Sequence, residues 1–268
     1  MKKNISVFIT LLIAVLVLTA CGTKEARIDK KIVIGVTPVP HTAILENVVK
    51  PILAKEGIEI EVKEFTDYVT PNLALADGSI DANYFQHIPY LNNFKEKRGL
   101  DLTEVTKVHI PPTALYSDKI SSLEELVEGS LVAIPSDPTN EGRALLLLER
   151  AGLIKLADDV ELTATPADII NNPKNLEFKE LEAAQLPRIL KDVDAAVITA
   201  NYAIEAELKP AEDAIIKEDA SSPYANVLAV RTEDKDNPAI KKLAEALNSQ
   251  AVKDFIIEEY QGNIIPAF

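Results

Sequence analysis

Short apolar segments rich in β-branched residues alternate along this chain with segments of helical periodicity. The strand-like segments cover residues 32–36, 58–65, 82–85, 107–110, 131–135, 160–164, 176–181, 195–199 and 226–231. The clearest helical patterns cover residues 42–56, 138–151, 181–190 and 238–260. Alternating strands and helices predict an α/β fold with mostly parallel sheet.

The helix predicted at residues 138–151 has signals at both ends. Asp137 before Pro138 is typical of an N-cap followed by the first helical residue, and Gly152 is typical of the position after a helix C-terminus. The apolar run 145–148 predicts burial on most sides. The helix N-terminus should then open at the sheet edge where open α/β sheets usually bind ligands.

Two extended segments, residues 108–117 and 222–231, predict that the chain crosses twice between two lobes. Two such crossings are the geometry of a hinged, two-lobed binding protein. A single doubly wound sheet without a hinge is the alternative. The expected first lobe covers residues 31–110 plus 229–268, and the expected second lobe covers residues 111–228.

The N-terminus has the order of a secretory signal: the basic start MKKN precedes an apolar stretch at residues 5–18. An uncleaved anchor is the alternative, although the stretch is shorter than the ~20 residues of a spanning helix. Cys21, the only cysteine, follows in "LTAC", which resembles the lipobox of bacterial lipoproteins. We expect a signal peptide at 1–20 and a tether at 21–30 that carries lipid on Cys21.

A lipidated Cys21 leaves no free thiol, which excludes a disulfide, a thiolate nucleophile and a cysteine-bound metal from the mature chain. The formal net charge is −14, and loss of residues 1–20 removes two lysines and no acidic residue. Such an acidic surface does not favour nucleic acid or anionic lipid headgroups. Contact with the membrane is therefore expected to come from the lipid.

Aromatic residues are concentrated in one part of the chain. Of the seven Phe and seven Tyr residues, six lie between positions 65 and 94. If 82–85 is a strand, Tyr84 and Phe85 point to opposite faces, one toward the core and one toward a cleft. A pocket walled by Phe85, Tyr90 and Tyr68 would suit an uncharged side chain and would favour sulfur.

His87 lies within the same aromatic segment, where a lone histidine is more often structural than functional. His41 and His109 show no metal-ligand spacing with it, so no metal is expected. An enzyme with His87 as general base is a further alternative. No Ser or Cys nucleophile accompanies His87 in these motifs, so we expect neither catalysis nor a cofactor.

Arg143 lies near the start of the predicted buried helix, and no acidic residue lies one turn away from it. A guanidinium beside free helical N–H groups is a favourable place for a ligand carboxylate. A salt bridge to an acidic residue from another strand or lobe is the alternative. Asn201 and Asn226 lie at strand ends, where an amide can bind a ligand's amino or carboxylate group or can simply stabilise a turn.

Four segments together carry a resemblance: "DYVTPNLAL", "NYFQHIPYL", "DPTNEGRAL" and "SPYANVLAVR". With the lipobox and the chain end "IIPAF", they resemble the NlpA family, the methionine-binding lipoproteins of ABC importers. The likeness runs in order from Cys21 to Phe268. It implies a two-lobed α/β fold of the periplasmic-binding-protein type (type II) that closes over one amino acid and presents it to a membrane permease with its ATPase subunits.

The resemblance also implies a set of binding residues. Those expected around the ligand side chain are Tyr68, Phe85, His87 and Tyr90. Those expected at the carboxylate and amine are Arg143, Asn201 and Asn226, with Asn140 close by. The sequence departs from the family near Thr199, where another Asn is expected.

The resemblance predicts a monomeric, lipid-anchored protein on the extracytoplasmic face of the cell membrane, either on the outer leaflet of a plasma membrane or on the periplasmic side. A methionine-containing dipeptide or another apolar amino acid is an alternative ligand, because one methylene in an apolar pocket is worth only ~1 kcal/mol. A surface lipoprotein that contacts other proteins is an alternative function.

Overall fold

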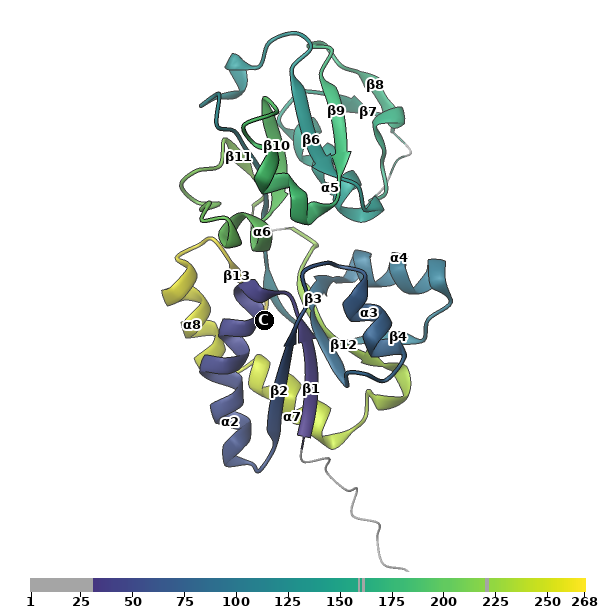
Figure 1. The fold of residues 1–268 in the computed structure, drawn as a ribbon, viewed down its shortest axis with the longest axis vertical. Helices are drawn as coiled ribbons and strands as arrows, with labels where there is room; N and C mark the ends of the chain where they lie inside the picture. Colours follow the sequence, from purple (N-terminus) through teal and green to yellow (C-terminus); the bar gives the residue numbers. More distant parts are fainter. Residues whose placement is uncertain (1–30, 159, 161, 220–221) are drawn as a thin grey trace, which may run out of the picture.

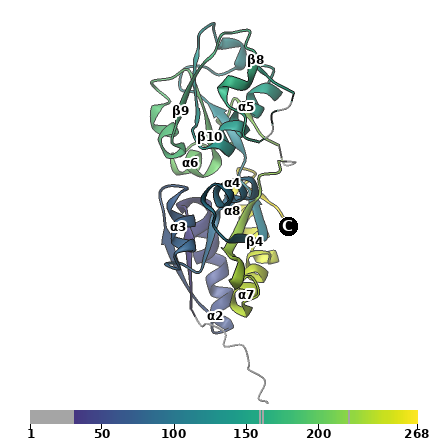
Figure 2. The same ribbon diagram turned by 90° about the vertical axis from the view of Figure 1, so that its right-hand side faces the viewer.

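A computed structural model describes residues 31–158, 160, 162–219 and 222–268. These residues form two α/β lobes that lie end to end, each on its own sheet (Figures 1 and 2). The α/β prediction is thus confirmed. The predicted signal peptide, Cys21 and the tether to residue 30 lie outside the described residues. Within the described part of the chain, no helix is both long and apolar enough to cross a membrane.

The first lobe is built on a six-stranded sheet. In spatial order its strands are β13 (Ile265–Pro266), β4 (Leu102–Ile110), β12 (Asn226–Arg231), β3 (Ala82–His87), β1 (Lys31–Val36) and β2 (Glu59–Glu64). Its helices and helical turns are η1 (Pro38–Thr42), η2 (Leu45–Val49), α2 (Lys50–Lys55), α3 (Thr70–Ala76), α4 (Ile88–Arg98), η6 (Thr232–Asp234), α7 (Pro238–Leu247) and α8 (Gln250–Tyr260).

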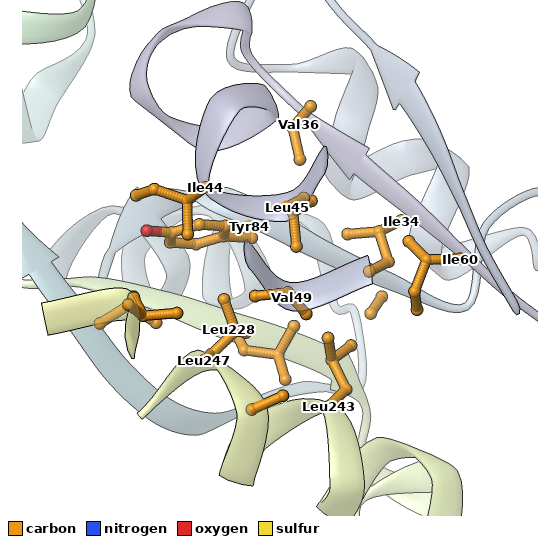
Figure 3. Packing of buried hydrophobic residues seen from close by; sticks show 14 of the residues in the cluster. Ile34, Val36, Ile44, Leu45, Val49, Ile60, Tyr84, Leu228, Leu243 and Leu247 are labelled. Atoms are coloured by element: carbon orange, nitrogen blue, oxygen red, sulfur yellow. The ribbon is translucent and has the colours of Figure 1, made fainter. Parts of the chain in front are cut away.

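The two faces of this sheet have separate cores because successive strand residues point to opposite sides. Leu228 packs with Leu243 and Leu247 of α7 on one face, together with Tyr84 (Figure 3). Val227 belongs instead to the cluster under α3 and α4. Because its side chains alternate in direction, β12 contributes to the cores beneath the helices on both faces of the sheet.

The second lobe is built on a five-stranded sheet. In spatial order its strands are β11 (Ile216–Lys217), β5 (Thr113–Tyr116), β10 (Ala195–Thr199), β6 (Leu131–Pro135) and β9 (Glu177–Leu181). A short ribbon adds β7 (Lys155–Leu156) and β8 (Ile169–Asn171). Its helices and helical turns are η3 (Leu123–Glu125), α5 (Pro138–Arg150), η4 (Pro166–Asp168), η5 (Ala183–Ile189) and α6 (Ala200–Glu205).

Helix α5 has the predicted ends. The Asp137 side chain accepts a hydrogen bond from Asn140 N at 3.0 Å, Pro138 is the first helical residue, and Gly152 beyond the C-terminus has a φ of +75°. Most of the helix is buried, including the run Leu145, Leu147 and Leu148. Its N-terminal turn contacts the first lobe, where His87 Nε2 lies 3.1 Å from Asn140 Oδ1.

The chain crosses between the sheets from β4 to β5 and again from β11 to β12. The crossings lie side by side, since Glu218 N donates to Thr113 O at 3.0 Å. The expected lobe boundary at 228/229 falls inside β12, which joins the first sheet from Asn226 onward. Strand β5 follows the first crossing and runs antiparallel to β10. Strand β12 follows the second crossing and runs antiparallel to β3 and β4. The sheets are therefore mixed, and the prediction of mostly parallel sheet was wrong.

Two predicted elements differ in the structure. The described residues of 160–164 form no strand: Leu162 and Thr163 lie in a turn that packs against α5, where a Cβ on Gly142 would lie 2.5 Å from Leu162 O. The single helix predicted at 238–260 is two helices. The break between the two helices lies at Ser249, which is the N-cap of α8. Its hydroxyl accepts a hydrogen bond from Val252 N at 3.3 Å.

Candidate functional site

A cavity of about 20 Å³ lies between the two lobes. This volume is enough for about one water molecule, so a larger ligand requires the lining side chains or the lobes to move. The structure brings all eight predicted binding residues together on its wall: Tyr68, Phe85, His87, Tyr90, Asn140, Arg143, Asn201 and Asn226. Three lining residues were not among them: Gln86, Pro111 and Thr199.

One wall of the cavity is aromatic and belongs to the first lobe. Tyr84 points into the core (Figure 3), so Phe85 on the opposite face of β3 points to the cavity. The ring centroid of Tyr68 lies 6.0 Å from Phe85 and 5.9 Å from Tyr90, within the range of favourable aromatic pairs. Tyr90 donates its hydroxyl to Tyr68 O at 2.8 Å. Because burial raises the pKa of both tyrosines, this wall is uncharged.

Asn201 faces this wall from the first turn of α6, directly after β10. Its Oδ1 accepts from the Tyr68 hydroxyl at 2.6 Å, and that hydroxyl also lies 3.0 Å from Thr199 Oγ1. Asn201 Nδ2 is buried and has no hydrogen-bond partner among the described residues. A buried donor left unpaired costs about 1–3 kcal/mol. This N–H group is therefore available to an acceptor in the cavity.

His87 is held in one tautomer at the end of β3. Tyr90 N donates to His87 Nδ1 at 3.1 Å, so the ring proton is on Nε2, which donates to Asn140 Oδ1 at 3.1 Å. Asn140 Nδ2 in turn donates to Asp137, the N-cap of α5. Burial, aided by the charge of Arg143, lowers the pKa of His87 to about 3. The neutral ring thus joins the lobes, and its one lone pair is already engaged.

Arg143 lies on the cavity wall and also forms the salt bridge that was the alternative reading. Its Nε donates to Glu218 Oε1 at 2.8 Å, and its Nη2 donates to Glu218 Oε2 and to Pro111 O. The ring of Tyr224 lies 4.3 Å from the guanidinium carbon. Glu218 was not predicted, because residues 215–223 carry no periodic signal. Binding of a ligand carboxylate by Arg143 stays a prediction.

Asn226 lies at the start of β12, where the second crossing enters the first sheet. Its Nδ2 donates to Phe85 O at 2.9 Å and lies 3.0 Å from His41 Nε2. Both N–H groups of the amide are thereby engaged. Oδ1 is the part of the amide that remains for a ligand, and it can only accept.

Comparison with known proteins agrees with this geometry. The NlpA lipoprotein family model matches residues 32–268. The D-methionine-binding lipoprotein MetQ of Salmonella typhi is 45% identical over 256 residues, which are 95% of this chain and 94% of that protein.

Two solved structures share both the sequence and the fold. A nutrient-binding protein from Burkholderia cenocepacia bound to methionine is 46% identical with a TM-score of 0.86, and the match covers 88% of this chain and 100% of that chain. A periplasmic substrate-binding protein of an ABC transporter from Coxiella burnetii is 48% identical with a TM-score of 0.84 over the same shares. The prediction from the four motifs is confirmed, and this chain belongs to the NlpA lipoprotein family.

Proposed function

We propose that this protein captures methionine in the cavity between its lobes and delivers it to the permease of an ABC importer. The observation that carries the proposal is the unpaired Nδ2 of Asn201, a buried donor on a residue that lines the cavity together with the aromatic side chains. A zwitterion with an apolar tail matches this combination of groups. The relative from Burkholderia cenocepacia, which has methionine bound, supports the same ligand.

The two asparagines would distinguish the ends of the zwitterion. Asn201 offers a donor, which suits the carboxylate, while Asn226 offers an acceptor, which suits the ammonium group. Arg143 adds positive charge near the carboxylate. Because Glu218 already neutralises that guanidinium, we expect Arg143 to orient the carboxylate more than to attract it.

The ligand side chain would lie among Tyr68, Phe85 and Tyr90. Burial of an aliphatic thioether contributes roughly 2–3 kcal/mol, and sulfur gains further from contact with aromatic rings. These three aromatic residues carry no charge, so a charged ligand side chain would be desolvated among them without a partner.

Mass spectrometry of the purified protein, before and after denaturation, tests the proposal without assuming a ligand. We expect released methionine in a ratio near one per chain, and titration calorimetry of ligand-free protein with L- and D-methionine gives the affinity. Absence of binding to either enantiomer would contradict the proposal.

A methionine-containing dipeptide is the second candidate ligand. A groove of about 530 Å³ shares Tyr68 and Tyr90 with the cavity, so movement of these rings would join the two spaces. A thermal-shift screen over apolar amino acids and short peptides compares the candidates directly. A larger stabilisation by dipeptides than by methionine would favour the second candidate.

The location and the partners are part of the same proposal. We infer that Cys21 carries lipid, that the mature chain is a monomer on the extracytoplasmic face, and that it binds without catalysis. Radioactive palmitate should label the wild-type protein but not a Cys21→Ala variant. Reconstituted permease should hydrolyse ATP faster when this protein and methionine are added, which an adhesion protein would not cause.

A further inference from the structure

His41 lies outside the cavity wall, yet it contacts a residue that lines the cavity. It belongs to η1 and is completely buried. Its ring packs against Tyr84 at 4.7 Å and His109 at 5.2 Å between centroids. Its Nε2 lies 3.0 Å from Asn226 Nδ2.

The position of the proton on His41 follows from a main-chain group. His41 Nδ1 lies 3.0 Å from Thr37 O, and a carbonyl oxygen can only accept. Nδ1 therefore carries the proton, and Nε2 presents a lone pair to Asn226. Burial lowers the pKa of His41 to about 3, so the ring remains neutral at physiological pH.

A second main-chain group fixes the other end of this series of hydrogen bonds. The amide atom of Asn226 that faces Phe85 O at 2.9 Å must be a donor, which identifies it as Nδ2. The second N–H of Nδ2 meets the lone pair of His41. Two carbonyl oxygens, Thr37 O and Phe85 O, thus define the direction of every hydrogen bond between them.

We propose that His41 is a positioning residue that holds the Asn226 amide with its carbonyl oxygen toward the ligand, so that the site selects a protonated amine. This inference rests on the proposed amino-acid binding. Without the lone pair of His41, one N–H of Asn226 would lose its partner and only Phe85 O would hold the amide, so Oδ1 would be held less firmly toward the ligand. An ammonium group would then lose part of its charge-assisted hydrogen bond to Oδ1.

Two ligands separate this role from a general effect on folding. Methionine carries the amine, and 4-(methylthio)butanoate has the same tail and carboxylate without the amine. For the wild-type protein, calorimetry should show a clear preference for methionine. For His41→Phe, we expect methionine to bind about 10-fold to 100-fold more weakly, while the deaminated ligand changes by less than about 3-fold.

Two further variants complete the design. His41→Gln supplies one acceptor and one donor, so it should recover much of the preference for methionine. Tyr84→Phe removes a hydroxyl from the same buried cluster without touching Asn226, so it should leave the preference unchanged. Circular dichroism of each variant checks that the fold is retained.

The wild-type protein provides a readout that needs no variant. Nitrogen-15 NMR of the His41 ring should show the tautomer protonated at Nδ1, and a ring protonated at Nε2 would overturn the inference. An unchanged ratio of the two affinities in His41→Phe would overturn it as well, while leaving methionine binding intact. Failure of the wild-type protein to bind methionine would instead reject the proposed function.

Discussion

Arg143 and Glu218 form an ion pair in which the side chains are only 1% and 3% exposed. Thr113 N also donates to Glu218 Oε2 at 3.1 Å, and Pro111 O accepts from Arg143 at 2.8 Å. The pair therefore ties helix α5 to both crossings. Its removal would affect stability as well as binding, and the two effects can be separated.

Arg143→Met leaves the Glu218 carboxylate buried without its partner. We expect a loss of about 3–5 kcal/mol in the free energy of unfolding, because an uncompensated buried charge is costly. The double variant Arg143→Met with Glu218→Leu replaces both charges by apolar groups and should recover most of that loss. Urea denaturation of the three proteins measures both changes. Equal stability of the single and double variants would contradict this account.

The same double variant tests the role of Arg143 in binding. If Arg143 orients the ligand carboxylate, the double variant should bind methionine at least about 10-fold more weakly than wild type despite its restored stability. Calorimetry gives the affinity. Wild-type affinity in a stably folded double variant would show that the guanidinium serves the crossings alone.

Tyr68→Phe removes the hydroxyl that donates to Asn201 Oδ1. The amide loses the bond that holds its Oδ1 in place, so methionine affinity should fall by about 5-fold to 30-fold. Tyr202→Phe is a matched control, since its hydroxyl also joins the lobes, at 3.1 Å from Thr66 O, but lies outside the cavity. Similar losses in both variants would assign the effect to lobe contact rather than to Asn201.

All three histidines should make the protein sensitive to acid. Burial lowers the pKa of His41 and His87 from 6.5 to about 3, and that of His109 well below 6.5. From pH 6.5 down to about 3 the unfolded chain binds protons that the folded chain does not, so the free energy of unfolding falls as pH falls. Burial raises the pKa of Glu141 from 4.5 to about 7 and also raises the pKa of Asp137, and these two carboxyl groups oppose the trend.

Denaturation at pH 8, 7, 6 and 5 measures this dependence. Each histidine should contribute a loss of about 1 kcal/mol between pH 6 and pH 5. His109→Phe removes one titrating group. Between pH 6 and pH 5 its free energy of unfolding should therefore fall by about 1 kcal/mol less than that of wild type. Parallel curves would show that His109 does not titrate in this way.

Two glycines near α5 should resist substitution for different reasons. A Cβ on Gly142 would lie 2.5 Å from Leu162 O and 2.8 Å from Ala164 N, so Gly142→Ala should cost about 1–3 kcal/mol by crowding. Gly152 has open space but a φ of +75°, so Gly152→Ala should cost about 1–2 kcal/mol by backbone strain.

Asparagine distinguishes the two mechanisms. At position 152 it should be tolerated better than alanine, because asparagine adopts the left-handed conformation more readily. At position 142 its larger side chain should be tolerated less well than alanine. Thermal unfolding of the four variants gives both comparisons, and the same order at both positions would contradict the distinction.

Local signals in the sequence were sufficient for much of the fold. Asp137, Pro138 and Gly152 defined α5 because caps and breakers act over one helical turn. The four family motifs contain every predicted cavity residue except Asn201, although these residues lie in both lobes. The cap at Ser249 was missed because the apolar period of α7 continues into α8.

The remaining features depend on contacts between distant parts of the chain. Glu218 is 75 residues from Arg143, and Asn226 is 185 residues from His41. No spacing in the sequence links such pairs. The direction of the strands was misjudged for the same reason, since it depends on where each crossing returns and not on the residues of the strand.

Because the amide of Asn226 is aligned through main-chain carbonyls at Thr37 and Phe85, its alignment depends little on which ring occupies position 85. The residues that bind the amine are therefore independent of the residues that contact the ligand side chain. Substitutions at Phe85 or Tyr90, in nature or in biosensor engineering, could change the specificity toward other amino acids without changing the residues that bind the amine.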